Sequence, residues 1–432
     1  MSRPRSSKLF LIPLVLLLFR TLGIEARASE LVGHVYVQTN ETQNRIMHFG
    51  RNADGQLELL ESIPTGGAGS GVFKPISGQD SAPNAFEGAG SVILAESNTL
   101  LFTTNGGDNS VTSFRVSPDG KLTVIDRQST GEPVTGRSGT AKSLAYRPQS
   151  RTLYVLHAFG PNHLRSYTVS KDGKLKLRPE RHSVNTATKT DRVATQAVLS
   201  RDGRFLLVDI LFDARPAANP DGSPNLVVAN APDPDGLVIF PVRDDGTLDE
   251  ASFVDAGGAG PFYIAFLNRS RDTFLNGFAV GDGVLVSRID GEGRVTNGPL
   301  APIDTSLGKP SELCWLQVTS DNSLVLATNF GYGTVSTYRL AEGRLSLLQD
   351  PADEAIPGEN LDKQENSIWF QLRMNGFPNP DVQKAWNAQG EAAFAYDVLE
   401  EVKDDNALII GELLKEREAA WRKEMGAAKL MG

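Results

Sequence analysis

The chain has 432 residues, a formal net charge of −9 and a single cysteine, Cys314. The acidic balance disfavours nucleic acid and anionic membrane surfaces as partners, and a single cysteine excludes an internal disulfide. The 42 glycines and 24 prolines suit a protein with many tight turns. The composition therefore indicates a turn-rich globular protein that is stabilised by a large core.

The first 28 residues have the pattern of a secretory signal peptide. Basic residues come first, an apolar run follows at 9–19, and Ala26-Arg27-Ala28 is a small-residue cleavage site. The run is shorter than the roughly 20 residues that span a bilayer, although an uncleaved anchor is the alternative. Cleavage would remove five basic groups and one acidic group from the charge of −9, leaving −13. We expect a secreted or periplasmic protein without membrane contact after cleavage.

A hairpin signal recurs six times along the chain. In each copy, two alternating stretches flank a turn in which glycine follows or lies beside an acidic residue. Such turns need a positive φ angle, which glycine supplies. The spacing between successive turn glycines is 47 to 73 residues. The six glycines are Gly55, Gly120, Gly173, Gly246, Gly293 and Gly343.

Two further apolar segments precede most of these hairpins, as at 141–148 and 152–159. Each unit therefore comprises four short strands, and nothing from Ser29 to about Pro357 has a helical pattern. Four-stranded units with a period near 50 residues are typical of β-propeller blades. We predict an all-β protein with a propeller over 29–372, in which six blades are legible.

The meander connection assigns the loops to two faces of the ring. The acidic-glycine turns all fall on one face, whereas longer irregular segments at 66–90, 130–140 and 213–236 fall on the other. Long loops gathered on a rigid scaffold are common binding sites. We call this second face the loop-bearing face and expect the functional site there.

The repeats resemble those of the lactonase-like seven-bladed propellers, which include bacterial 6-phosphogluconolactonases and fungal carboxymuconate-lactonising enzymes. The resemblance covers about 33–358 and rests on blade patterns such as "SRDGRFLLVDILFD" at 200–213. It implies seven blades and a lactone as substrate. It also implies roles for the residues at strand ends: Asp209 and Asp213 match an acidic pair, Asn105 and Asn329 match strand-ending asparagines, and Glu312 matches an acidic residue that opens a late blade.

The catalytic groups of that family are poorly matched. Thr195 and Gln196 stand where the family has histidine, Phe262 and Tyr263 replace an Arg-His pair, and Phe330 replaces an arginine. Lactone chemistry needs a base and groups that stabilise the developing oxyanion. The resemblance therefore supports the scaffold more than the activity.

Two functions follow from these residues. The first is opening or closing of a lactone on an acidic small molecule, with His157, Asp209 and Glu312 as acid/base groups. The second is a non-catalytic propeller that binds a sugar, peptide or protein through the loop-bearing face. His157 or Asp209 in the central channel would favour the enzyme, and the same groups in contacts between blades would favour the binder. The predicted substrate-binding residues are Asn105, Arg137, Asp213, Tyr263 and Asn329.

We expect neither a metal nor a cofactor. The segment at 213–236 contains Asp and Asn residues that offer oxygen ligands, but no complete calcium loop. Zinc-ligand spacing, a phosphate-binding loop and a dinucleotide fingerprint are all missing from the sequence. The oligomeric state is left open.

The propeller pattern stops after Gly358. Ser367–Leu372 has the composition of one more strand, which would pair with the first blade and cover its edge. From Asp381 onward Ala, Glu, Leu and Lys dominate, which favours helix. We therefore predict a helical C-terminal extension over 373–432.

Overall fold

The computed structural model describes residues 31–69, 89–133, 139–215, 217, 234–303, 311–330, 334–349 and 380–389. Within them, strands are the only long regular elements apart from one helix, α3 (Pro380–Gln389), which confirms the all-β class. The predicted signal peptide, Ser367–Leu372 and all of the predicted extension except 380–389 lie outside the described residues. No helix in the described part is long and apolar enough to cross a membrane.

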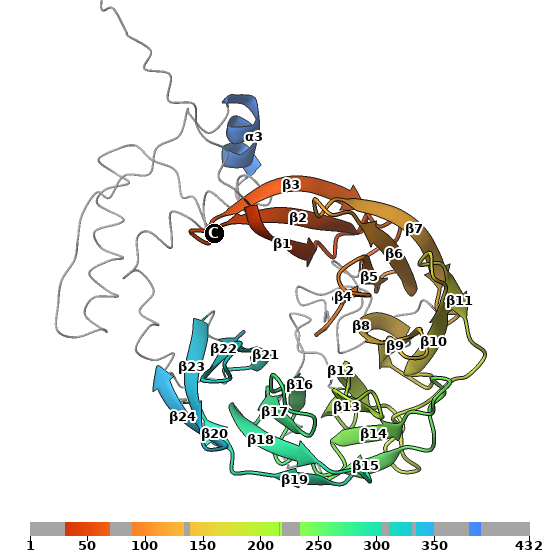
Figure 1. The fold of residues 1–432 in the computed structure, drawn as a ribbon, viewed down its shortest axis with the longest axis vertical. Helices are drawn as coiled ribbons and strands as arrows, with labels where there is room; N and C mark the ends of the chain where they lie inside the picture. Colours follow the sequence, from red (N-terminus) through yellow and green to blue (C-terminus); the bar gives the residue numbers. More distant parts are fainter. Residues whose placement is uncertain are drawn as a thin grey trace, which may run out of the picture.

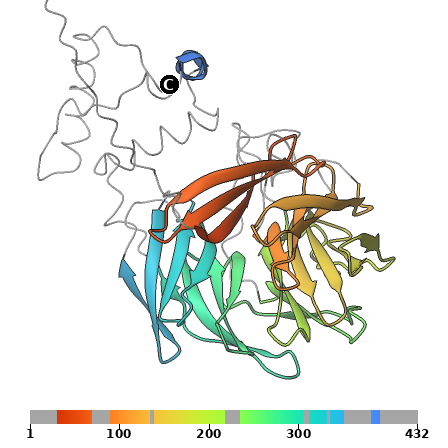
Figure 2. The same cartoon turned by 45° about the horizontal axis from the view of Figure 1, so that its top comes forward.

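The strands form antiparallel sheets that follow one another around a ring, the arrangement of a β-propeller (Figures 1 and 2). The first sheets contain β1 (Leu31–Gln38), β2 (Arg45–Asn52), β3 (Leu57–Pro64), β4 (Val92–Ala95), β5 (Leu100–Asn105), β6 (Ser110–Val116) and β7 (Leu122–Ser129). The middle strands are β8 (Gly139–Arg147), β9 (Thr152–Phe159), β10 (Leu164–Val169), β11 (Leu175–Leu177), β12 (Val193–Leu199), β13 (Phe205–Phe212), β14 (Leu237–Pro241) and β15 (Ser252–Val254). The last are β16 (Pro261–Phe266), β17 (Thr273–Phe278), β18 (Gly283–Ile289), β19 (Val295–Asn297), β20 (Ala301–Pro302), β21 (Leu313–Val318), β22 (Leu324–Asn329), β23 (Thr334–Ala341) and β24 (Arg344–Gln349).

The strand order within each sheet is a simple meander. The orders are β1-β2-β3, β4-β5-β6-β7, β16-β17-β18-β19 with β20 on β18, and β21-β22-β23-β24. The strands β8–β11 and β12–β15 form two such meanders, which join into one sheet through the pair Val193–Phe159. The first strand of each four-stranded unit lies nearest the centre of the ring (Figure 1).

All six acidic-glycine turns form as predicted. Their glycines have φ angles from +73° to +88°, the left-handed region that other residues rarely adopt. In the turn that joins β6 to β7, for example, the Gly120 N–H donates to the Ser117 carbonyl at 2.9 Å. The recurrence in the sequence is therefore the recurrence of one local backbone conformation.

The core consists of apolar side chains between neighbouring sheets. Phe102, Leu153 and Tyr167 pack between β4–β7 and β8–β11, while Leu207 and Phe274 pack between β12–β15 and β16–β20. As a result, every residue of β5, β9, β13 and β17, the second strands of these units, is buried on both faces of its sheet. This two-sided burial explains why apolar residues occur in a row in these strands and do not alternate with polar ones.

The first and last sheets differ from the rest. In β22 burial alternates, so only one face is covered by described residues. The sheet β1–β3 carries its acidic-glycine turn between β2 and β3, so β1 occupies the second-strand position, and no described strand pairs with its inner edge. Most of the exposed large apolar side chains lie in these two sheets: Leu31, Val32, Val37, Leu57, Leu59, Leu60, Trp315, Leu326, Val335 and Leu348.

The turn glycines offer a test of this fold. Gly55→Ala should cost about 1–2 kcal/mol of stability, because alanine must adopt a left-handed conformation where nothing lies within 4 Å of a new Cβ. Gly246→Ala should cost clearly more, because its Cβ would also collide with the Thr152 side chain of the neighbouring unit. Urea unfolding of both variants measures the difference, and equal losses would contradict the packing described here.

Candidate functional site

Asn105, at the end of β5, is fully buried and holds neighbouring sheets together. Its Nδ2 donates to Ser110 Oγ and Thr112 Oγ1, both at 3.0 Å. Its Oδ1 accepts from Asn44 Nδ2 at 2.9 Å and from Thr65 Oγ1 at 2.7 Å. The amide thus uses its hydrogen-bonding capacity within the protein, which is what a buried polar group requires.

Asn329, at the end of β22, makes the same local bonds. Its Nδ2 donates to Thr334 Oγ1 at 3.2 Å and Ser336 Oγ at 2.9 Å, the same five- and seven-residue spacing as at Asn105. The spacing Asn-x4-[Ser/Thr]-x-[Ser/Thr] is visible in the sequence and marks a link between the second and third strands. Unlike Asn105, its Oδ1 accepts no hydrogen bond and is buried, so a ligand role for this oxygen stays a prediction.

His157, at the end of β9, is fully buried. Its Nε2 lies 2.9 Å from Thr130 Oγ1, which follows β7 in the preceding sheet, and its Nδ1 lies 3.1 Å from the His163 carbonyl oxygen. The carbonyl only accepts, so Nδ1 carries the proton and Nε2 accepts from the Thr130 hydroxyl. In the described structure His157, the predicted general base, therefore links two neighbouring sheets.

His163 extends this buried network. Its Nδ1 accepts from the Val184 N–H at 3.3 Å, and its Nε2 donates to the Arg192 carbonyl oxygen at 3.2 Å. Burial lowers the pKa of His163 to about 4, so the ring is neutral at physiological pH. The two histidines thus link the sheet β4–β7 to the segment that enters β12.

Asp209, in β13, is fully buried beside Asn276 of β17. Its Oδ1 accepts from Asn276 Nδ2 at 3.2 Å, while its Oδ2 and the Asn276 Oδ1 have no hydrogen-bond partner. A protonated carboxyl group can donate to such an amide oxygen. Burial raises the pKa of Asp209 well above its usual value. The carboxyl therefore lies between two sheets without access to solvent, where burial favours its protonated form.

Asp213 belongs to an ion-pair network on the loop-bearing face. Its Oδ1 lies 2.9 Å from Arg192 Nη2 and its Oδ2 lies 2.6 Å from Lys189 Nζ. Asp235 contacts the same two cations. Arg192 is fully buried, whereas Asp213 is 39% exposed and Lys189 and Asp235 are about a quarter exposed. The network joins the segment that precedes β12 to the loop between β13 and β14. The Asp213 and Asp235 carboxylates are hydrogen-bond acceptors in it, the Lys189 ammonium is a donor, and all three are partly exposed to solvent.

Sequence reasoning missed this network. Lys189 and Arg192 lie in a basic connection that reads as a solvated stretch, and their acidic partners are 21 to 46 residues away in the sequence. The sequence showed that an acidic residue follows β13, but it did not show which basic side chains would pair with that residue.

Glu312 and Tyr263 lie near the inner strands of the last two sheets. Glu312 precedes β21, is half-buried and has a φ angle of +50°, which is rare for a residue with a side chain. Burial and the charge of Glu312 raise the pKa of Cys314 to about 12, against the opposing charge of Lys142. Glu312 and Lys142 therefore both lie within electrostatic range of the thiol. Burial also raises the pKa of Tyr263, which stays protonated and can donate.

The inner strands are packed by an apolar cluster on this side of the ring. Phe159, Val193, Phe212, Phe262 and Cys314 contribute to it from β9, β12, β13, β16 and β21. The predicted substrate residue Arg137 lies outside the described residues. Among the other predicted site residues, only Asp213, Glu312 and Tyr263 are not fully buried, and the structure does not bring His157, Asp209 and Glu312 together through any hydrogen bond to one another.

Comparison with solved structures supports the predicted resemblance at the level of the fold. Two "putative 6-phosphogluconolactonases" are similar. That of Bacteroides uniformis has TM-score 0.51 and 14% identity over 73% of this chain and 80% of its own, and that of Bacteroides fragilis has 0.50 and 16% over 74% and 82%. A periplasmic gluconolactonase of Pseudomonas aeruginosa has TM-score 0.50 and 15% identity over 73% and 82%. No protein-family model and no curated protein sequence matches. At such identities the likeness shows a lactonase-type propeller fold and nothing finer.

The buried carboxyl of Asp209 predicts an unusual effect on stability. The pKa of Asp209 in the folded state lies above its value near 3.9 in the unfolded state. Between these two pKa values the folded state binds more protons than the unfolded state, so the stability of the wild type falls as the pH rises from the lower value to the higher one. Asp209→Asn removes this cost and retains a donor for the Asn276 amide oxygen. The variant should therefore have a higher Tm than wild type at pH 7 and a similar Tm near pH 4.

Asp321→Asn is the matched control. Hydrogen bonds from Thr319 and Ser323 lower the pKa of this exposed turn carboxyl to about 2, so its replacement should lower the Tm at pH 7. A loss of stability in Asp209→Asn at pH 7 would show that Asp209 is ionised and paired in the folded protein.

Proposed function

We propose that this chain is an exported propeller that binds a small sugar-like molecule on its loop-bearing face and does not catalyse lactone chemistry. The burial of His157 and Asp209 in contacts between sheets carries the proposal, because neither group can reach a lactone from there. A general base must lie within hydrogen-bond reach of the proton that it removes. The lactonase-type fold is compatible with a binding function, since one fold hosts many functions.

The ligand class follows from the exposed part of the ion-pair network. Asp213 and Asp235 offer carboxylate acceptors beside the Lys189 ammonium donor. A polyol hydroxyl both donates and accepts, so it matches this mixed set. An anionic acid would meet two carboxylates there and an acidic protein overall, with a charge of −9 before cleavage. A neutral sugar therefore fits this surface better than an organic acid.

Export is part of the proposal. The basic, apolar and small-residue sections of 1–28 support a cleaved signal peptide. The periplasmic location of the Pseudomonas aeruginosa neighbour is compatible with the same compartment for this chain.

Lactone hydrolysis is the second candidate, and the backbone at Glu312 favours it. A non-glycine residue with φ of +50° costs roughly 1–3 kcal/mol and tends to persist at functional sites. In this alternative Glu312 would activate water, Tyr263 would donate to the carbonyl oxygen, and Lys142 would contribute positive charge. The solved neighbours named as gluconolactonases support the choice of a sugar lactone as substrate.

We also propose that Ser367–Leu372, which lies outside the described residues, supplies the missing inner strand to β1. The support is that no strand in the described part of the chain pairs with the inner edge of β1, together with the apolar composition of Ser367–Leu372. The first sheet would then have four strands like the others, and residues 373–432 would follow as the extension.

A disulfide test addresses this strand pairing in the full exported chain. In a Cys314→Ser background, Val35→Cys on β1 should form an intramolecular disulfide with Ile368→Cys or Trp369→Cys, since facing residues of paired strands have Cβ atoms about 4.5–5.5 Å apart. Glu58→Cys, on β3 at the far edge of the sheet, is the control and should not cross-link. Cross-links only between molecules, seen on non-reducing gels, would contradict the pairing.

The proposed binding is tested by calorimetry of residues 29–432 with neutral hexoses, aldonic acids and lactones. We expect a neutral sugar to bind and Asp213→Asn to weaken binding about tenfold, the usual effect of losing one charged hydrogen bond. Asp54→Asn, in the turn after β2 on the opposite face, should leave affinity unchanged. Equal affinity in Asp213→Asn and wild type would place the site elsewhere.

A further inference from the structure

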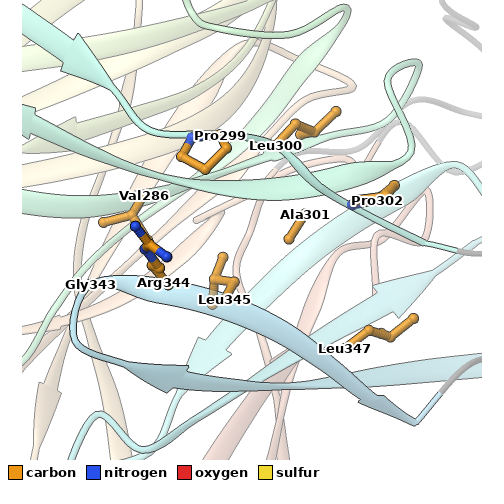
Figure 3. A pocket seen from close by; sticks show the side chains of 9 residues that line it. All are labelled: Val286, Pro299, Leu300, Ala301, Pro302, Gly343, Arg344, Leu345 and Leu347. Atoms are coloured by element: carbon orange, nitrogen blue, oxygen red, sulfur yellow. The ribbon is translucent and has the colours of Figure 1, made fainter.

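A pocket of about 500 Å³ lies between the two last described sheets (Figure 3). The strands β20 and β24 that line it lie at the outer rim of the ring (Figure 1). Val286 of β18 and the segment Pro299–Pro302 form one wall, and Arg344, Leu345 and Leu347 of β24 form the other. Its size is within the range of about 300–1,000 Å³ that small-molecule sites occupy. Neither the network at Asp213 nor any predicted site residue contributes to it.

The first wall is preformed. The Gly298 N–H donates to the Val286 carbonyl at 2.8 Å, and the Ile303 N–H donates to the Asp282 carbonyl at 2.9 Å, so both ends of the segment are bonded to the sheet. Between them, β20 pairs with β18, and Pro299 and Pro302 restrict the backbone. A ligand that enters this pocket would not have to order the wall.

The pocket is apolar except for one cation. Ala301 packs with Leu345 and Leu347, the prolines Pro299 and Pro302 line the same pocket, and Arg344 lies beside Val286 at one end (Figure 3). The Arg344 guanidinium makes no ion pair or hydrogen bond with a side chain or backbone group in the described part of the chain. An apolar trough with a single charged group is the usual design of a site that orients an amphipathic ligand.

Comparison with the other turns shows that this arrangement is particular to the last sheet. Lys121, Lys174 and Arg294 follow the turn glycine just as Arg344 does. Each pairs with an acidic residue of its own turn, at 3.1 Å for Lys121–Asp119, 4.0 Å for Lys174–Asp172 and 2.8 Å for Arg294–Asp290. Arg344 instead directs its guanidinium to the pocket, although Glu342 lies two residues before it (Figure 3). Its charge is thus available to a ligand.

We propose that this pocket binds an aliphatic carboxylate. The hydrocarbon chain would lie between Ala301, Leu345 and Leu347, and the carboxylate would accept hydrogen bonds from the Arg344 guanidinium, which suits carboxylate geometry. Because the protein as a whole is acidic, its general field disfavours anions. Among the described residues that line the pocket, Arg344 is the one cation, so the proposal assigns the selection of a carboxylate to it.

The test is calorimetric titration of the full chain with decanoate and, in parallel, with decanol. We expect decanoate to bind and decanol to bind more weakly. Arg344→Gln should weaken decanoate binding about tenfold or more, the usual cost of losing a charge-assisted pair. Ala301→Phe should abolish binding by filling the trough. Arg294→Gln, the equivalent position one unit earlier, is the matched control and should leave affinity unchanged.

The outcomes separate the alternatives. No binding of decanoate to the wild type overturns the proposal. Equal affinity for decanol and decanoate, or equal affinity of Arg344→Gln and wild type, would show a non-selective apolar surface and also overturn it. Since sugar binding at Asp213 is measured with other ligands and other variants, the two proposals can fail separately.

Discussion

Two-sided burial of sheets is the constraint on which this structure depends. A sheet with a neighbour on each side is covered on both faces, so every residue of its second strand is buried, as in β5, β9, β13 and β17. Polar side chains at the ends of such strands cannot reach water and must find partners in the neighbouring sheet. Asn105 and Asp209, two positions that the family resemblance marks as functional, lie in such strands. Both are hydrogen-bonded to side chains of neighbouring sheets.

For function, this means that the polar groups fall into two sets: those buried between sheets and those exposed to solvent. Asn105, His157 and Asp209 are bonded to neighbouring strands and sheets, and a ligand could reach them only if those contacts opened. The charges around Asp213 stay partly accessible on the loop-bearing face. On the outer side, Arg344 is the accessible charge beside an apolar pocket. Recognition of ligands by these exposed groups therefore fits the structure better than acid/base chemistry by the buried ones.

The sequence predicts the local features well and the long-range ones poorly. Turn glycines such as Gly120 could be identified because the positive φ angle is a property of a few adjacent residues. The partner of His157 could not, because Thr130 is 27 residues away in another unit. The pairing of Arg192 with Asp213 could not be predicted either, because these residues are 21 positions apart in the sequence. Arg344 follows its turn glycine as Arg294 does, so only the three-dimensional arrangement reveals that it faces a pocket and not its own turn.

The most direct test of the central claim is acid release from a panel of sugar lactones at neutral pH by the folded chain 29–432, with Asp209→Asn and Glu312→Gln beside it. Our account predicts no release above spontaneous hydrolysis for any of the three proteins. Turnover by the wild type that either substitution abolishes, while the fold is retained, would contradict it and place lactone chemistry on the loop-bearing face.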